Sequence, residues 1–182
     1  GKWQDMLVMS LATIGVTIPS FVIASLLIYF FSYKLNWLPT FGLDSWKGYI
    51  LPVIALGGYS LSYMARLMRS SLLEVMGQDY IRTARAKGLS ETSVILKHAM
   101  RNALIPVITV LGPTIANMMT GSFVIEKIFA IPGLGVHFVN SVSQRDYTTI
   151  MGVTIFYAAF LMAMIFIVDI FYCLIDPRIK YD

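Results

Sequence analysis

Charged residues are scarce in this 182-residue chain, and their scarcity excludes an ordinary soluble domain. Only 13% of the residues are charged, whereas a soluble domain carries about 25%. Hydrophobic residues make up 57% of the chain, and the mean hydropathy is +0.72. Four runs carry no charge at all, and each is near or above the ~18 apolar residues that indicate a membrane-spanning helix. These runs cover residues 6–33, 48–65, 102–125 and 147–168.

Groups that perform chemistry are scarce as well. The single cysteine, Cys173, excludes an internal disulfide. His98 and His137 lie far apart, and neither has a cysteine or carboxylate at ligand spacing, so we expect no metal ligand. The nucleotide-binding pattern GxxxxGK(S/T) does not occur, so we do not expect the chain itself to hydrolyse ATP. No nucleophile and base pattern lies inside an apolar run, so we expect no catalytic residue.

The uncharged runs predict an all-α membrane protein with about four transmembrane helices. The second run is the shortest, and it becomes long enough only if its helix continues toward Arg66 or Arg69. The long side chains of both arginines can reach the membrane interface from such a position. The predicted transmembrane helices cover residues 6–34, 48–72, 102–129 and 147–175, and a water-soluble segment covers residues 74–101.

Basic residues are concentrated around residues 74–101, here called the basic segment. Lysine and arginine accumulate in cytoplasmic segments close to helix ends. This rule predicts that the basic segment and both ends of the chain are cytoplasmic, and that residues 36–47 and 131–147 lie outside. The net charge of +4 follows this distribution and does not indicate nucleic-acid binding. The side predicted to be cytoplasmic carries Lys2, Arg66, Arg69, Arg82, Arg85, Lys87, Lys97, Arg101, Arg178 and Lys180, and the other carries Lys34, Lys47, Lys127 and Arg145.

The basic segment is predicted to fold as helix, glycine turn, helix. Good helix formers lie on both sides of Gly88. Gly88 can end the first helix in the left-handed conformation. Ser90 can cap the second helix, and Glu91 in its first turn has the sign that the helix dipole favours.

A second break in the pattern is Ile-Pro-Gly-Leu-Gly at residues 131–135, here called the Pro-Gly turn. Proline and glycine end a helix and allow tight backbone approaches. Two interpretations stay open, namely a plug-like element at the mouth of a pathway and an ordinary turn. We interpret Glu126 and Lys127 as a solvated or interhelical pair rather than a binding site. Asp169 is interpreted as a structural group near its helix end rather than a substrate contact.

The stretch Arg82-Thr-Ala-Arg-Ala-Lys-Gly88 resembles the EAA loop of ABC importer permeases, in the variant typical of peptide importers. Ala84 and Gly88 match the general pattern of Glu-Ala-Ala, three residues and Gly, while Arg82 and Thr83 depart from it. Other stretches resemble the same family in the same order. They are Ile18-Pro-Ser-Phe21, His98-Ala-Met-Arg-Asn-Ala-Leu-Ile-Pro106, Gly121-Ser-Phe-Val-Ile-Glu126, the Pro-Gly turn, Arg145-Asp-Tyr147 and Asp176-Pro-Arg-Ile-Lys180.

The resemblance covers nearly the whole chain and is strongest to the first permease subunit of bacterial oligopeptide and dipeptide importers. It implies the C-terminal core of a subunit that has six helices in full, in the bacterial plasma (inner) membrane. The implied partners are a second permease subunit, two cytoplasmic ABC ATPases, an extracellular peptide-binding protein and the lipid bilayer. No cofactor is expected on this chain, because ATP and Mg²⁺ belong to the partner ATPases. No nucleic acid is expected.

The resemblance also implies site residues. The short helix before Gly88 would sit in a groove of an ATPase, with Ala84 and Ala86 allowing close approach. Arg85 and Lys87 would pair with acidic groups of that partner. The implied ATPase-coupling residues are Arg82, Thr83, Ala84, Arg85, Ala86, Lys87, Gly88, Leu89 and Ser90, and the residues implied at the outer gate or receptor side are Pro132, Gly133, Leu134 and Gly135.

Other functions stay open beside the peptide importer. A nickel or glutathione importer of the same permease type would share these residues. On charge alone, the basic segment could simply bind anionic lipid. An intramembrane enzyme would need convergent reactive groups at membrane depth, and an ion channel would need a filter-like repeat; neither pattern is present in the sequence.

Overall fold

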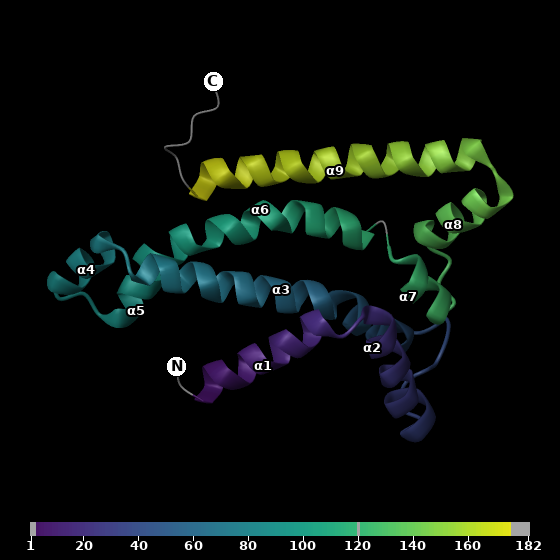
Figure 1. The fold of residues 1–182 in the computed structure, drawn as a ribbon, viewed down its shortest axis with the longest axis horizontal. Helices are drawn as coiled ribbons and strands as arrows, with labels where there is room; N and C mark the ends of the chain where they lie inside the picture. The colour runs from purple at the N-terminus through teal and green to yellow at the C-terminus, as the bar shows by residue number, and fades with distance from the viewer. Residues whose placement is uncertain (1–2, 120, 176–182) are drawn as a thin grey trace.

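The computed structural model describes residues 3–119 and 121–175, with the last four of these described by their backbone only. These residues form helices joined by turns and short loops (Figure 1), and no strand occurs among them. The all-α prediction is confirmed. The predicted cytoplasmic residues Lys2, Arg178 and Lys180, and the stretch from Asp176 onward, lie outside the described residues.

The described helices follow one another in a simple order along the chain. Two of them, η1 and η3, are π-helices that continue an α-helix, and η2 is a short 3₁₀-helix. The bounds are α1 Trp3–Thr17, α2 Ser20–Leu27, η1 Ile28–Lys34, η2 Trp46–Tyr49, α3 Ile50–Met76, α4 Asp79–Ala86, α5 Glu91–Ser93, η3 Val94–Ala99, α6 Met100–Met119, α7 Phe123–Ile128, α8 Leu134–Gln144 and α9 Tyr147–Ile175.

Three stretches are long and apolar enough to cross a membrane, namely Trp46–Met76, Glu91–Ile128, which includes residue 120 outside the described residues, and Tyr147–Phe171. The segment predicted as the first transmembrane helix is divided in the structure. Its two halves, Trp3–Thr17 and Ser20–Lys34, are bent by 106° at the intervening Ile18 and Pro19. Proline restricts the residue before it and lacks an N–H, which suits this break. The described chain therefore has three candidate spans, or four if the bent pair crosses as one.

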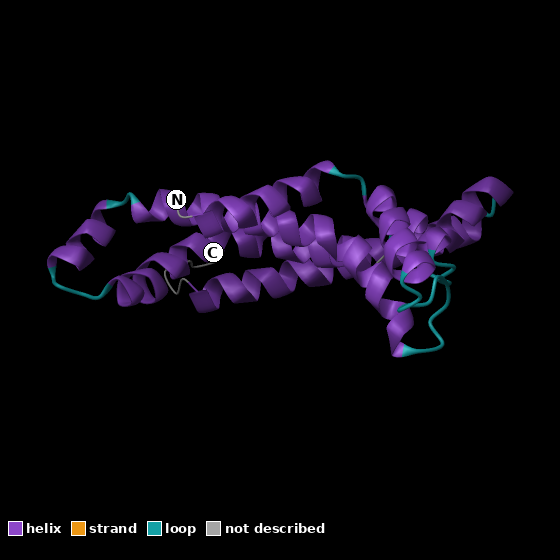
Figure 2. Ribbon diagram, turned by 90° about the horizontal axis from the view of Figure 1, so that it is seen from below, coloured by secondary structure: helices purple, strands orange, loops and turns teal. Residues whose placement is uncertain are grey.

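The long helices lie side by side, and the short ones lie at the two ends (Figures 1 and 2). Contacts join α9 to α6, α6 to α3, and α3 to α1. Glycine allows some of these helices to approach closely. A Cβ atom on Gly112 of α6 would lie 3.1 Å from the backbone oxygen of Met164 on α9. The start of α1 and the end of α9 lie toward the end of the bundle that carries α4.

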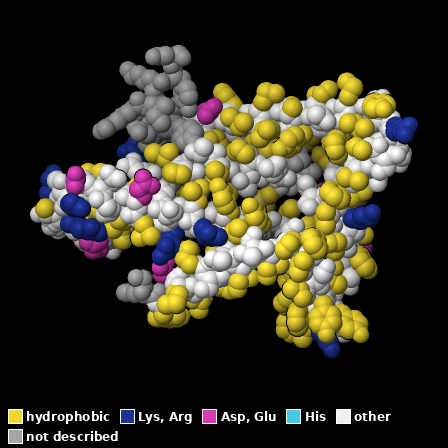
Figure 3. All heavy atoms as spheres, in the orientation of Figure 1, with side chains coloured by type: hydrophobic (Ala, Val, Ile, Leu, Met, Phe, Trp, Pro, Cys, Tyr) yellow, Lys and Arg dark blue, Asp and Glu magenta, His cyan; other side chains and the backbone are white. Residues whose placement is uncertain are grey.

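Hydrophobic side chains cover much of the face of the bundle that Figure 3 shows, while charged ones lie mainly toward its ends. Such a surface is expected where lipid replaces water, because lipid tails give apolar side chains no reason to turn inward. Each end of the bundle contains one buried apolar cluster that packs its helices together. The first joins α2, α3 and α7 through Ala24, Leu51, Ala55, Ile125 and Phe129, and the second contains Ile81, Ala84, Val94 and Ala99.

Candidate functional sites at the two ends of the bundle

The basic segment folds as a helical hairpin beyond the end of α3 (Figure 1). Gly88 has a φ of 77°, and its N–H donates to the Arg85 carbonyl oxygen at 2.9 Å. The Oγ atom of Ser90 accepts the backbone N–H of Ser93 at 3.4 Å, so Ser90 is the N-cap of the next helix. Both local predictions, the left-handed glycine and the serine cap, are confirmed.

The hairpin has a closed apolar core that fixes it to the long helices. Ile81 of α4 and Val94 of η3 are fully buried. Asn102 of α6 donates its side-chain N–H to the Tyr80 hydroxyl at 2.7 Å, which adds a polar link between α4 and α6. The hairpin is therefore packed as part of the bundle end. The partly buried residues against this core are Leu72, Val75 and Met76, all at the end of α3.

The residues implied in ATPase coupling fall into two groups in the structure. Ala84 is only 6% exposed and belongs to the hairpin core, so its small size serves packing within the chain rather than the approach of a partner. The other eight are exposed at the hairpin tip and on the outer side of α4. These are Arg82, Thr83, Arg85, Ala86, Lys87, Gly88, Leu89 and Ser90.

Arg85 already has an acidic partner within the chain. Its Nε atom donates to Glu91 Oε1 at 2.7 Å, and its second guanidinium nitrogen donates to Oε2 at 3.3 Å. This hydrogen bonding raises the pKa of the Arg85 guanidinium above its usual value. The pair closes the glycine turn, since it joins α4 to α5. The sequence analysis identified Glu91 only as a favourable charge at a helix start. The opposite charges of Arg85 and Glu91 on the two sides of the predicted turn could have indicated this ion pair.

At the opposite end, the Pro-Gly turn connects α7 to α8. The Ile131 N–H donates to the Glu126 carbonyl oxygen at 2.8 Å, and the Gly133 N–H donates to the Ile131 oxygen at 3.0 Å. The preceding Ala130 has a φ of 53°, which lets the chain reverse after α7. Pro132 is exposed, whereas Gly133, Leu134 and Gly135 are half-buried.

Of the two expectations for Glu126, solvation is wrong, and the side chain instead makes an interhelical contact with the backbone of α8. Glu126 is 7% exposed, and its Oε2 atom accepts the backbone N–H of Val136 at 2.8 Å. Lys127, its neighbour in sequence, is exposed. Sequence reasoning missed this arrangement because charge pattern alone does not show that the chain folds back onto α7 ten residues later.

A pocket of about 600 Å³ opens beside the Pro-Gly turn and is lined by residues of α6, α7, α8 and α9. Leu134 and Gly135 contribute to its lining. Among its polar groups, the Tyr157 hydroxyl donates to the Asn117 side-chain oxygen at 2.7 Å. The turn therefore borders a cavity with both apolar and hydrogen-bonding walls.

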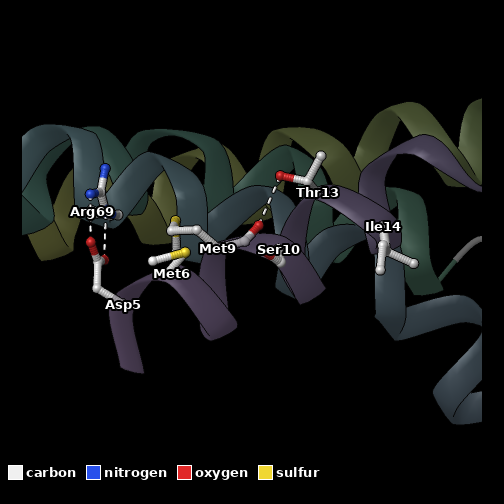
Figure 4. A pocket seen from close by; sticks show the side chains of 7 residues that line it. All are labelled: Asp5, Met6, Met9, Ser10, Thr13, Ile14 and Arg69. Atoms are coloured by element: carbon white, nitrogen blue, oxygen red, sulfur yellow. Dashed lines mark hydrogen bonds and ion pairs between the residues drawn. The ribbon is translucent and has the colours of Figure 1, made fainter. Parts of the chain in front are cut away.

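Another pocket, of about 580 Å³, lies between α1 and α3 (Figure 4). Arg69 donates from two nitrogens to the two carboxylate oxygens of Asp5, each at 2.6 Å. This two-point geometry is the strong form of an ion pair. Arg69 therefore joins α3 to α1. The lining residues are Asp5, Met6, Met9, Ser10, Thr13, Ile14 and Arg69.

The sequence pattern of a family described as "Binding-protein-dependent transport system inner membrane component" matches residues 1–181. The chain belongs to this family. Several helices apolar enough to span a bilayer agree with an inner-membrane component of this kind.

Relatives of this transport family member are permease proteins. It is 55% identical over 176 residues to the dipeptide transport system permease protein DppB of Bacillus subtilis (strain 168). It is 47% identical over 180 residues to the glutathione transport system permease protein GsiC of Salmonella typhimurium (strain LT2), and 46% identical to GsiC of Escherichia coli (strain K12). These alignments cover 97–99% of this chain but only 57–59% of the relatives' length. The resemblance to peptide-importer permeases is confirmed.

Proposed function

We propose that this chain is the core of a permease subunit that carries peptides through the bacterial inner membrane, powered by ATPases on its cytoplasmic side. The observation that carries the proposal is the hairpin of the basic segment. It presents an exposed basic tip, and a buried apolar core fixes that tip to the end of α3 and to η3, which continues into α6. A hairpin packed in this way can transmit a displacement caused by another protein to the membrane helices.

In this proposal α4 sits in a groove of one ATPase, which moves when ATP binds. The motion reaches α3 through Ile81, because that side chain has no room to shift within its core. It reaches α6 through Val94 and the Tyr80–Asn102 hydrogen bond. Helices that move as packed units then open the pathway alternately to the two sides.

The proposed orientation places the basic segment in the cytoplasm and the Pro-Gly turn outside. The excess of arginine and lysine in and around the hairpin supports it. The proposed partners are a second permease subunit, two cytoplasmic ABC ATPases and an extracellular peptide-binding protein. ATP and Mg²⁺ belong to the ATPases, and this chain itself binds no cofactor.

Peptides are the proposed substrate class because DppB, a relative at 55% identity, is named as a dipeptide permease. Glutathione is the second candidate, because GsiC is named as a glutathione permease and is 47% identical over 99% of this chain. A nickel importer of the same type stays a prediction from the sequence resemblance. Uptake of labelled dipeptides in competition with glutathione, by the assembled transporter, separates the first two.

The test of coupling is a cysteine crosslink from Ala86 to the ATPase in the full-length subunit, with Cys173 replaced. Ala86 lies at the exposed end of α4, and we expect a crosslink whose yield changes when ATP is added. Ala84→Cys is the matched control, because Ala84 lies on the same helix but is 6% exposed. An assembled complex that gives no crosslink from position 86 refutes the proposal.

A further inference from the structure

Glu126 is a buried carboxylate at the opposite end of the bundle from the hairpin. It lies on α7 and holds both sides of the Pro-Gly turn. Its backbone oxygen accepts the N–H of Ile131, where the turn begins, and its side-chain Oε2 accepts the N–H of Val136, just after the turn ends; both distances are 2.8 Å. One residue therefore fixes the entry and the exit of the same turn.

The side chain of Glu126 supplies a cap that α8 lacks. The first N–H groups of a helix have no partner within the helix, and a side-chain oxygen at the N-cap usually accepts one of them. The N-cap of α8 is Gly133, which has no side-chain oxygen. Val136 is the third residue of this 11-residue helix. The carboxylate thus replaces the missing cap from a neighbouring helix, and its negative charge suits that helix end.

Glycines leave the space that the carboxylate occupies. A Cβ atom on Gly133 would lie 2.5 Å from Oε1 and 2.6 Å from Oε2 of Glu126. A Cβ atom on Gly135 would lie 3.2 Å from Oε1, and one on Gly121 would lie 3.0 Å from Cδ. Gly133 has a φ of −110°, which any residue can adopt. Its lack of a side chain is therefore explained by the neighbouring carboxylate and not by backbone conformation.

We propose that Glu126 is a positioning residue, which pins the Pro-Gly turn and α8 to α7 so that the turn presents a fixed surface to the extracellular peptide-binding protein. This inference rests on the proposed function and its orientation. Pro132, at the exposed tip between the two pinned points, is placed to touch that partner. Without the Glu126 side chain, the turn can adopt other positions relative to α7. The position that the binding protein recognises is then less populated, which weakens docking.

The experiment uses the full-length subunit in the assembled transporter, reconstituted in vesicles. Uptake is measured against the concentration of the binding protein for Glu126→Ala, Glu126→Gln and the exposed-neighbour control Lys127→Ala. We expect Glu126→Ala to raise the half-saturating concentration about tenfold, with the uptake rate at saturation changed less than twofold. Glu126→Gln keeps an oxygen that can accept the Val136 N–H, so it stays within about twofold of wild type, as does Lys127→Ala.

Amide hydrogen exchange in the first turn of α8 gives a readout independent of transport. We expect it to rise about tenfold in Glu126→Ala and to stay near wild type in Glu126→Gln. Gly133→Ala tests the same contact from the other side, because its Cβ displaces the carboxylate. In the double variant Gly133→Ala with Glu126→Ala the obstruction is gone, so the combined effect is no larger than that of Glu126→Ala alone, whereas independent sites would add.

Additive effects in the double variant overturn the inference, and so does a wild-type half-saturating concentration in Glu126→Ala. If Glu126→Ala fails to assemble, the remaining single variants decide. Impaired docking in Gly133→Ala with normal docking in Glu126→Gln supports the pin, and equal, normal docking in both overturns it. A wild-type transporter that shows no ATP-driven uptake would instead refute the proposed function, so the two failures are distinguishable.

Discussion

Gly88 offers the sharpest test of the proposal that the hairpin couples this chain to an ATPase. Its φ of 77° is a conformation that costs an ordinary residue about 1–2 kcal/mol. A Cβ atom added there would meet nothing within 4 Å. The cost of a side chain at Gly88 within this chain is therefore conformational and not steric, and it grows from asparagine, which tolerates this region, through alanine to a β-branched residue.

This ordering predicts the behaviour of three variants. Because about 1.4 kcal/mol is tenfold in an equilibrium, Gly88→Ala should lower the population of the native turn by roughly 5- to 30-fold relative to its alternatives, and Gly88→Val by more. Gly88→Asn should lie closest to wild type. We expect the ratio of substrate transported to ATP hydrolysed to fall in the order Asn, Ala, Val, measured in vesicles with the assembled transporter.

The same series can refute the reasoning. If side-chain size at a contact with the ATPase decides the outcome, asparagine, which is as bulky as valine, will be as harmful as valine. Wild-type coupling in Gly88→Val would show that the left-handed turn has no part in transmission. Size-exclusion chromatography of each purified variant measures whether the complex assembles, and so distinguishes a loss of coupling from a loss of the complex.

Three further predictions concern the remaining contacts. Ile81→Ala leaves a cavity in the hairpin core and should lower the free energy of unfolding by about 2–5 kcal/mol, seen as a lower thermal midpoint, whereas Leu89→Ala at the 40% exposed tip should leave it nearly unchanged. Arg85→Glu should reduce the position-86 crosslink, and adding Glu91→Arg should restore it if the ion pair acts within the hairpin; no restoration would show that Arg85 meets an acid of the partner. Hydrogen bonds from Thr149 lower the pKa of Asp146, so the stabilisation of the start of α9 is fully present above the ordinary aspartate pKa of about 3.9 and is lost as the pH falls through the lower folded-state value. Amide exchange at Thr149 should report that loss, and Asp146→Asn should abolish its pH dependence; a pH-independent wild type contradicts the assignment.

Features that depend on neighbours in sequence were predictable. The turn at Gly88 and the cap at Ser90 follow from residue type and a three-residue spacing, and hydropathy alone was enough to predict an all-α membrane protein. The partners of polar side chains that are far apart in the sequence could not be predicted in this way. Arg69 meets Asp5 across 64 positions, and no pattern along one helix selects that partner. The resemblance singled out Ala84 as a contact residue, but its burial depends on which face of α4 meets α3.

The bend near Pro19 shows a different limit. Hydropathy measures how apolar a segment is, and residues 6–33 carry no charge and are mostly apolar, so one continuous helix was the simplest prediction. The direction of a helix depends on the backbone and not on hydropathy. Pro19, at the N-cap of α2, permits a 106° change in helix direction within a segment that stays largely apolar. Similarly, the charge of Glu126 predicted a solvent-exposed side chain. The fold instead supplies a backbone N–H and a space lined by glycines, which make burial of the carboxylate possible.

The helical stretch that runs from Glu91 through η3 to the end of α6 at Met119 is longer than a bilayer requires. At ~1.5 Å per residue it measures roughly 43 Å, against a hydrocarbon thickness of about 30 Å. A helical stretch of that length extends past the hydrocarbon layer, so the hairpin attached to its start can lie in water while its middle lies in lipid. Under the proposed function, the surface that meets the ATPase and the part of the chain that lies in lipid are then joined by one continuous run of helix, with no loop between them.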